Sequence, residues 1–391
     1  MSAAYEFLAP GKIVFGWGRR SELARLAASL GRRAFVVLGS RTLAASGVWA
    51  ALDEQLRGEG ITPVLAETIS QEPTVADVDR LTARLVERGA APGDWLLAVG
   101  GGSAIDLAKA AAALATNREA TSVVDYLEGV GRGLKINLPP LPLVAVPTTA
   151  GTGSEATKNA VISSYDPPFK KSLRSDAMLA RLVLVDPELT VSVPPTITAW
   201  TGMDAITQLI ESYTSRAARP IPSALAAQAL PAALEALPRA VRDGTDRPAR
   251  EALAHAALAS GLALANSGLG LAHGVAAALG CLAGVTHGLA CAVMLPVALR
   301  VNRDVARSRL AELARAVFTR TLGSDEAAAD ALIERIDALG AELGVPTKLS
   351  ALGVRREQLD ALVVASRGNS MNGNPRQLSD VELRDILESL L

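Results

Sequence analysis

The amino-acid sequence predicts an α/β domain with a mostly parallel sheet, followed by an all-helical domain. In the first half of the chain, short apolar runs alternate with segments of helical pattern. After about Pro194, long Ala- and Leu-rich segments follow one another and no convincing strand is present. The length of 391 residues is enough for two domains with a large buried core. We therefore assign residues 1–190 to the first domain and residues 191–391 to the second.

Five short apolar runs are the expected strands of the first domain. They are residues 34–38, 63–66, 95–99, 143–146 and 181–185. Most of them stop at a residue that favours a turn, such as Gly39, Gly100 or Pro147. Residues 21–30 and 75–88 have the pattern of helices between strands. Strands that alternate with helices of this size predict a parallel sheet with helices on both of its faces.

Composition and charge exclude several classes of function. The formal net charge is -1 with mixed signs, so nothing in the composition indicates a nucleic-acid partner. Residues 252–299 contain no Asp, Glu, Lys or Arg, which on charge alone suggests a membrane span. This stretch is dominated by Ala and Gly and contains histidines and Asn266, so we expect buried helices of a soluble domain.

The N-terminal sequence and the cysteines predict a cytoplasmic protein. The first twelve residues include Glu6 and lack the basic-then-apolar order of a signal peptide. The two cysteines, Cys281 and Cys291, both lie in an apolar stretch, and we expect buried structural thiols rather than a disulfide framework.

A glycine-rich turn after the third expected strand has the features of a phosphate-binding loop. Residues 99–109 read VGGGSAIDLAK, and the glycines let backbone N–H groups approach an anion without interference from a Cβ atom. Ser103 is the expected N-cap of the next helix, with Asp106 completing a capping box. The free N–H groups and positive dipole end of that helix suit a pyrophosphate. The alternative is a tight turn with a structural role only.

A second polar glycine loop, residues 147–155 with the sequence PTTAGTGSE, follows the next expected strand. Three threonines and a serine lie beside two glycines, so several hydroxyl and amide groups are able to reach a nucleotide. Two such loops at the ends of consecutive strands predict a Rossmann-like dinucleotide-binding domain.

The two loops belong to a longer series of motifs. The series continues through DPELT (186–190), TGMDA (201–205), LGLAHG (269–274), HGLACAVMLP (287–296) and NPR (374–376). In this order the motifs resemble those of the iron-containing (group III) alcohol dehydrogenase family of the dehydroquinate synthase-like superfamily. The resemblance covers nearly the whole chain. It implies an NAD(P)-dependent alcohol dehydrogenase or aldehyde reductase, with a metal and substrate site in the cleft between a nucleotide-binding domain and an all-α domain.

The same resemblance implies the residues that bind the cofactor. The pyrophosphate is expected on Gly101, Gly102 and Ser103, with Asp106 supporting the loop. The rest of the nucleotide is expected beside Thr148, Thr149 and Thr152, and the ribose near Lys171. A solvated surface lysine is the alternative for Lys171.

The residues after the first expected strand bear on cofactor preference. In family members that prefer NAD, an aspartate often follows the corresponding strand, which is the second strand of the family fold. Its carboxylate binds a ribose hydroxyl and repels a 2′-phosphate. Here Gly39, Ser40 and Arg41 supply no carboxylate, and Arg41 is able to pair with a phosphate. We therefore expect NADP(H) to be accepted along with, or in preference to, NAD(H).

The resemblance also implies a metal site at Asp204, Gln208, His273 and His287, where Asp204, His273 and His287 are the expected catalytic residues. Asp204 and Gln208 are four residues apart and share one face of a helix. His273 and His287 are fourteen residues apart, so the chain must turn between them, and residues 280–284 have the glycines for that turn. Such a set suits Fe(II) or Zn(II), which would polarise the oxygen of a small aldehyde or alcohol.

The sequence departs from the family pattern twice. The family usually has histidine where Gln208 stands, and often a further histidine where Ala277 stands. An amide oxygen is a weaker ligand than imidazole for such an ion. The alternative is a metal-independent enzyme like the maleylacetate reductases, with Asp204, His273 and His287 as a hydrogen-bonded cluster. In that case a substrate carboxylate requires a basic partner, and the candidates are Arg181, Arg216, Arg219 and Arg367.

The sequence leaves two further alternatives for the function. They are lyase chemistry of the dehydroquinate synthase type, against which the C-terminal motifs argue, and a nucleotide-binding protein without catalysis. The family also suggests a homodimer.

Overall fold

The computed structural model describes residues 4–391, which form two compact units. The α/β unit comprises residues 8–149 and 153–192. The helical unit comprises residues 4–7, 150–152 and 193–391. The main division of the chain, after residue 192, lies close to the boundary proposed from the sequence.

A six-stranded parallel sheet forms the centre of the α/β unit, in the order β1-β8-β5-β4-β2-β3. The strands are β1 (Ile13–Phe15), β2 (Arg33–Leu38), β3 (Thr62–Thr68), β4 (Asp94–Gly100), β5 (Leu143–Pro147) and β8 (Leu182–Val185). The five predicted strands are confirmed. The edge strand β1 was not predicted, because three residues are too short to show a periodic pattern.

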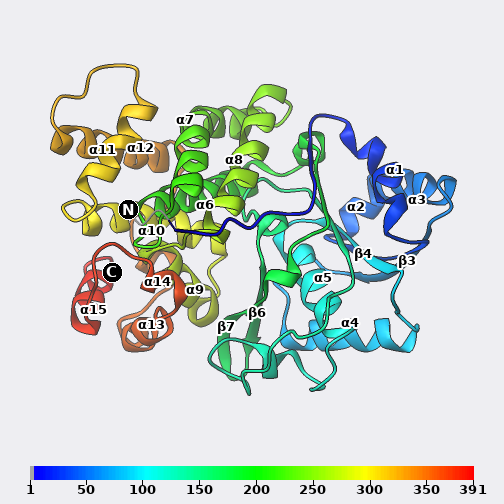
Figure 1. Ribbon diagram of the computed structural model, residues 1–391. Helices are drawn as coiled ribbons and strands as arrows, with labels where there is room; N and C mark the ends of the chain where they lie inside the picture. The colour runs from blue at the N-terminus through cyan, green and yellow to red at the C-terminus, as the bar shows by residue number, and fades with distance from the viewer. Residues whose placement is uncertain (1–3) are drawn as a thin grey trace. The chain divides into compact units, whose positions relative to one another are not determined.

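Helices cover both faces of this sheet (Figure 1). They are α1 (Leu23–Ala27), α2 (Arg41–Ala45), α3 (Val48–Gly58), α4 (Val75–Glu87) and α5 (Gly102–Leu114). Alternate residues of β4, namely Trp95, Leu97 and Val99, are fully buried in the core that α1 and α3 share. The predicted helix over residues 75–88 is confirmed as α4. The helical stretch predicted over residues 21–30 is confirmed, but only α1 is α-helical, with five residues, a 3₁₀ turn at each end and no side-chain cap.

An antiparallel hairpin, β6 (Asn159–Tyr165) and β7 (Pro168–Arg174), lies outside the main sheet. The sequence did not predict it. Strand β7 is mostly polar and partly exposed, and the apolar run of β6, from Ala160 to Ile162, is shorter than the runs on which the other predictions depended.

The helical unit contains no strand in its described residues, as predicted. Its helices are α6 (Pro195–Thr214), α7 (Pro220–Arg242), α8 (Arg247–Ala265), α9 (Leu271–Ala283), α10 (His287–Asn302), α11 (Arg307–Val317), α12 (Asp325–Glu342), α13 (Leu359–Ala365), α14 (Asn369–Asn372) and α15 (Asp380–Glu388). Residues 252–299 fall in α8, α9 and α10, which are largely buried. Among residues 4–391, no helix has the length and apolar character needed to span a membrane.

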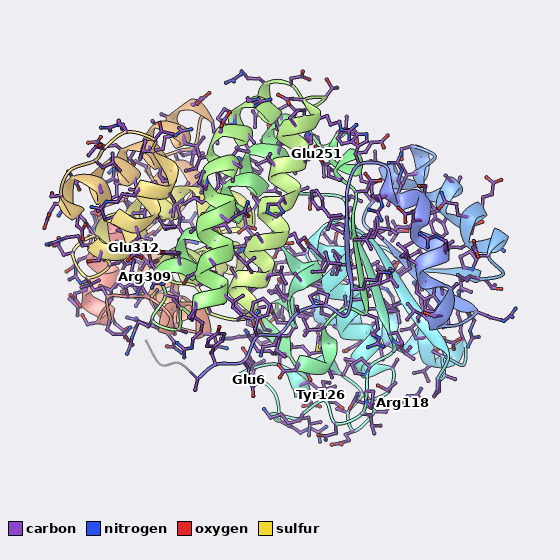
Figure 2. The ribbon with its side chains drawn as sticks, turned by 45° about the horizontal axis from the view of Figure 1, so that its top comes forward. Glu6, Arg118, Tyr126, Glu251, Arg309 and Glu312 are labelled. Carbon is purple, nitrogen blue, oxygen red and sulfur yellow. The ribbon has the colours of Figure 1, made fainter. Side chains whose placement is uncertain are left out.

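Helix α6 is the central element of this unit, since it contacts α7, α8 and α10. Its C-terminal end is held by Arg309 and Glu312 of α11, both labelled in Figure 2. The Tyr213 hydroxyl donates to Glu312 at 2.6 Å, and the Arg309 guanidinium lies 4.4 Å from the centre of the Tyr213 ring. These contacts fix the helix that carries the candidate metal ligands.

Candidate active site

The first part of the site lies where the order of successive strands in the sheet reverses. From β2 the chain crosses to β3 on one side and then to β4 on the other, so the carboxyl ends of β2 and β4 flank a topological switch point. Gly39 follows β2 and Gly100 ends β4. A Cβ atom built on Gly39 would lie 2.6 Å from the Gly100 Cα atom, so neither position accepts a side chain without movement. The predicted glycines therefore lie where dinucleotides bind in this class of fold.

The glycine loop after β4 leads directly into α5, with Gly101 at the N-cap. The predicted N-cap role of Ser103 and the capping box with Asp106 are wrong, because α5 already begins at Gly102 and no side chain caps it. The N–H groups at this helix end are thus left open to a ligand. Asp106 instead accepts a hydrogen bond from the Val161 N–H group at 3.1 Å, which ties α5 to the hairpin. Burial raises the pKa of this carboxyl group.

The second polar loop lies against the first. The Thr148 N–H group donates to the Gly100 carbonyl oxygen at 3.0 Å, and a Cβ atom on Gly101 would lie 3.1 Å from Thr149 Oγ1. Both threonines therefore lie beside the glycine loop, in the α/β unit. Thr152 belongs to the helical unit, where its carbonyl oxygen accepts from Gln208.

Lys109 holds the end of the second loop, a role that the sequence did not reveal. Its side chain is 1% exposed, and its ammonium group donates to the carbonyl oxygens of Ser154, Thr157 and Asn159 at 2.7 to 3.0 Å. Burial lowers the pKa of Lys109 to about 8. In the same region, burial raises the pKa of Glu155 to about 7. A lysine three residues after Asp106, followed by a polar loop, is the only signal the sequence offered.

The remaining predicted cofactor residues lie at different places in the α/β unit. Ser40 is the N-cap of α2 and accepts from the Leu43 N–H group at 3.2 Å. The side chain of Arg41 lies outside the described part of the structure. Lys171 lies on β7 opposite Ile162 and is partly exposed. The cofactor contacts of these residues stay predictions.

Helix α6 presents three polar side chains to the interior of the helical unit. Asp204, Gln208 and Glu211 are spaced four and three residues apart, so they share one helix face, and each is at most 5% exposed. The Gln208 amide nitrogen donates to Asp204 Oδ1 at 3.0 Å. Burial of three polar groups on one face is costly unless they bind partners, which marks this face as functional.

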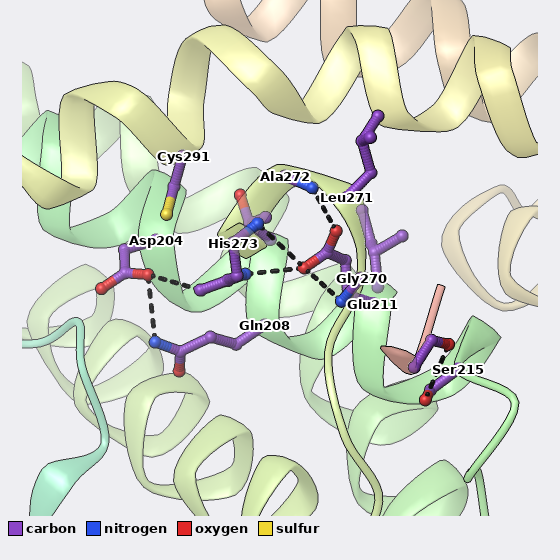
Figure 3. A network of polar contacts seen from close by, with 12 residues as sticks. Asp204, Gln208, Glu211, Ser215, Gly270, Leu271, Ala272, His273 and Cys291 are labelled. Atoms are coloured by element: carbon purple, nitrogen blue, oxygen red, sulfur yellow. Dashed lines mark hydrogen bonds and ion pairs between the residues drawn. The ribbon is translucent and has the colours of Figure 1, made fainter. Parts of the chain in front are cut away.

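His273, in the first turn of α9, is held between two of these carboxylates (Figure 3). Its Nδ1 atom lies 2.7 Å from Glu211 Oε2, and its Nε2 atom lies 3.2 Å from Asp204 Oδ1. Glu211 also accepts from the N–H groups of Gly270 and Ala272, at 3.0 and 2.7 Å. A carboxylate on Nδ1 directs the Nε2 lone pair of a histidine toward a metal ion, the usual arrangement at protein metal sites.

His287 reaches the same place because the chain turns after α9. Helix α9 ends at Ala283, Gly284 adopts the left-handed conformation with φ of 66°, and α10 begins at His287. The predicted turn between the two histidines is confirmed. Their ring centres are 5.6 Å apart, and His287 Nε2 lies 3.9 Å from Asp204 Oδ1.

A fourth side chain, Cys291, completes a cluster that is able to hold a metal ion. Ligand atoms of Asp204, His273, His287 and Cys291 all lie within 4.8 Å of one another. In a tetrahedral site with Zn–N and Zn–S bonds of about 2.0 to 2.3 Å, ligand atoms are separated by about 3.3 to 3.8 Å. Three of the six distances among these atoms, 3.2, 3.8 and 3.9 Å, are close to that spacing. The residues present therefore fit a divalent ion.

The cluster also has the electrostatics of a cation site. Burial raises the pKa of Asp204, but hydrogen bonding to His273 and the charge of His287 outweigh this effect, and the pKa is lowered overall. Burial likewise opposes a charged His273, yet the negative groups around it raise its pKa well above the usual value. The carboxylate thus stays ionised, and the cluster favours positive charge at its centre.

Other motif residues support the cluster from outside. Asn374 Oδ1 accepts from the Leu271 N–H group at 3.0 Å and from the Asn302 side chain at 2.8 Å, which explains the NPR motif as a brace for the first turn of α9. His255 lies away from the cluster, on α8, with Nε2 2.8 Å from Gln228 Oε1. Glu211 and Cys291 were missed by the sequence analysis. The only signal for Glu211 was its position seven residues after Asp204.

Two family models match the chain in order. Residues 10–187 match the iron-containing alcohol dehydrogenase model, and residues 198–391 match the C-terminal model of the same family. The chain belongs to the iron-containing alcohol dehydrogenase family. It is therefore an NAD(P)-dependent oxidoreductase that interconverts alcohols and carbonyl compounds, as the motifs predicted.

Relatives and solved structures agree over the full length. The chain is 34% identical to a probable alcohol dehydrogenase of Escherichia coli, with 95% of this chain and 91% of the relative covered. It is 32% identical to the lactaldehyde reductase of the same organism, with 95% and 96% covered. A 1,3-propanediol oxidoreductase structure superimposes with a TM-score of 0.91 at 30% identity, covering 99% of this chain and 100% of the other. The sulfoacetaldehyde reductase of Bifidobacterium kashiwanohense, solved with NAD⁺, gives 0.88 at 32% identity, covering 100% and 99%.

Proposed function

We propose that this enzyme interconverts small aldehydes and alcohols with a nicotinamide cofactor bound at the glycine loops and a divalent metal ion bound in the α6–α9–α10 cluster. The observation that carries the proposal is the convergence of Asp204, His273 and His287, from three helices, on one point, where Asp204 and His273 are buried and His287 is partly exposed. A purely hydrogen-bonded cluster does not require ligand atoms of four side chains to lie within 4.8 Å of one another. The metal-dependent alternative is thus favoured over the metal-independent one.

Each group of residues has a distinct task in this proposal. When bound, the metal ion supplies a Lewis acid for the substrate oxygen, and the nicotinamide supplies or accepts the hydride. Asp204 and the Nε2 atoms of His273 and His287 hold the ion, while Glu211 keeps His273 in the required tautomer. Gly101, Gly102 and Ser103 offer the N–H groups at the start of α5 to the pyrophosphate.

We also propose that the enzyme accepts NADPH. No carboxylate follows β2, since Gly39, Ser40 and Arg41 occupy that position. Without a negative charge in this segment, a 2′-phosphate is not repelled, and Arg41 gives the segment a positive charge. Comparison of kcat/KM for NADH and NADPH tests this proposal. A hundredfold preference for NADH would contradict it.

Metal analysis combined with turnover tests the function as a whole. The purified protein is analysed for bound elements, and NADH and NADPH oxidation is followed with a panel of short aldehydes before chelation, after chelation and after metal addition. We expect about one divalent ion per chain and turnover that chelation removes and metal restores. Turnover that survives stringent chelation would instead favour the maleylacetate-reductase-like mechanism. Failure to oxidise either cofactor with any aldehyde would refute the proposal.

We further propose a cytoplasmic homodimer that binds neither nucleic acid nor membranes. The mixed charge and net value of -1 support the lack of a nucleic-acid partner. Light scattering of the purified enzyme tests the dimer, and a monomer at micromolar concentration would contradict it.

A further inference from the structure

Five polar side chains surround the proposed metal position of the α6–α9–α10 cluster, whereas a tetrahedral ion takes four ligands and would expand to five-coordinate to accept the substrate oxygen. Asp204, His273 and His287 supply three of them. The fourth position has two candidates, the Gln208 amide on α6 and the Cys291 thiol on α10. The two candidates predict different metals, because an amide oxygen is a hard ligand and a thiolate is a soft one.

The hydrogen bonds of Gln208 orient its amide group. Two acceptors, Asp204 Oδ1 at 3.0 Å and the Thr152 carbonyl oxygen at 3.3 Å, face the same amide atom. An oxygen in that place would be repelled by both, so the atom is the NH₂ nitrogen, which has no lone pair for a metal ion. The amide oxygen lies on the other side, 2.6 Å from the Ser260 hydroxyl. Gln208 is thereby a hydrogen-bond donor that positions Asp204.

Cys291 is placed as a ligand by the helix that carries it. It follows His287 by four residues on α10, so the two side chains share one face, and the sulfur lies 3.8 Å from His287 Nε2. Figure 3 shows Cys291 directed toward Asp204 and His273. The residue is fully buried, and no disulfide joins it to Cys281.

We propose that Cys291, and not Gln208, is the fourth protein ligand, and that this Asp-His-His-Cys site takes Zn(II) in preference to Fe(II). The proposal rests on the metal-dependent function given above and assigns the chemistry of its site. A thiolate combined with two imidazoles is a donor set typical of zinc, whereas a carboxylate with two imidazoles and open positions is also typical of non-haem iron.

Cobalt(II) substitution provides a direct readout that does not depend on turnover. The full-length protein is stripped of metal and titrated with Co(II), and its absorption spectrum is recorded. A thiolate ligand gives an intense sulfur-to-cobalt charge-transfer band in the near ultraviolet. We expect this band in the wild type and its loss in Cys291→Ser. Because loss of a group that only supports a metal ligand already weakens metal binding about 10- to 100-fold, removal of the thiolate should weaken Zn(II) binding at least about 100-fold.

Two variants serve as controls. Cys281→Ser removes the other cysteine, which lies on α9 outside the cluster, and should keep both the band and the Zn(II) affinity. Gln208→Leu removes the amide and should keep the band, since sulfur remains bound. If Cys291→Ser does not fold, X-ray absorption of the wild-type zinc protein replaces it, and it should show one sulfur at about 2.3 Å from the metal.

The possible results separate this inference from the proposed function. Bound Co(II) without a charge-transfer band, a band that persists in Cys291→Ser, or a zinc site without sulfur would each overturn the ligand assignment and leave metal-dependent turnover intact. A wild type that loads Fe(II) more tightly than Zn(II) in an anaerobic competition would overturn the metal preference. A protein that binds no metal but reduces aldehydes would overturn both the inference and the metal-dependent mechanism.

Discussion

Replacement of Glu211 with alanine should destabilise the helical unit and weaken metal binding together. The carboxylate accepts hydrogen bonds from His273 Nδ1 at 2.7 Å and from the N–H groups of Gly270 and Ala272 at 3.0 and 2.7 Å. Removal leaves three buried donors, each of which costs about 1 to 3 kcal/mol without a partner. Relief of the buried charge and entry of water offset part of this total. We expect a loss of about 3 to 5 kcal/mol, as is typical for one partner of a buried ion pair.

The same change should lower metal affinity about 10- to 100-fold, because His273 loses the group that directs Nε2 toward the ion. Chemical denaturation of the metal-stripped protein measures the stability change, and a competition titration with a zinc chelator measures the affinity. Glu235→Ala on the exposed face of α7 is the matched control, since its carboxylate is 78% exposed and 3.7 Å from Arg239. It should change stability by about 0.5 kcal/mol or less. A Glu211→Ala protein with wild-type stability and affinity would refute the positioning role.

Three other predictions concern the α/β unit. Gly39→Ala should destabilise the protein by about 1 to 3 kcal/mol and weaken NADPH binding in a fluorescence titration, because its Cβ atom would lie 2.6 Å from the Gly100 Cα atom. The control Gly58→Ala, with open space around it, should be neutral or stabilising. Equal effects of the two changes would contradict the close approach of the strands. Ser40→Asp should keep the N-cap of α2 but lower kcat/KM for NADPH at least about tenfold relative to NADH, and an unchanged ratio would show that this position does not face the 2′-phosphate. Burial raises the pKa of Glu155 from 4.5 to about 7, so the folded state binds more protons than the unfolded state between these values. The free energy of unfolding should therefore fall by up to about 3 kcal/mol as pH rises from about 4.5 to 7, relative to Glu155→Gln, and parallel profiles of the two proteins would contradict this assignment.

The sequence by itself determined those features that depend on local pattern. Buried strands such as residues 95–99 are continuous apolar runs, and the glycine turn after them is visible because only glycine permits the close approach of backbones. Asp204 and the two histidines lie in motifs whose order is specific to one family. The turn at Gly284 was also predictable, since two ligands fourteen residues apart require one.

The tertiary structure decided which side chains surround the proposed metal position and how they are oriented. Glu211 and His273 are 62 residues apart in the chain, and no local pattern indicates that they meet. The orientation of the Gln208 amide depends on Asp204 and on Thr152, which come from different segments, and the approach of Cys291 depends on the packing of α10 against α6. These contacts join residues that are far apart in the sequence, because each forms where the polar face of one helix packs against another helix. For that reason the family motifs pointed to the proposed metal site, while the proposed fourth ligand became visible only in the folded chain.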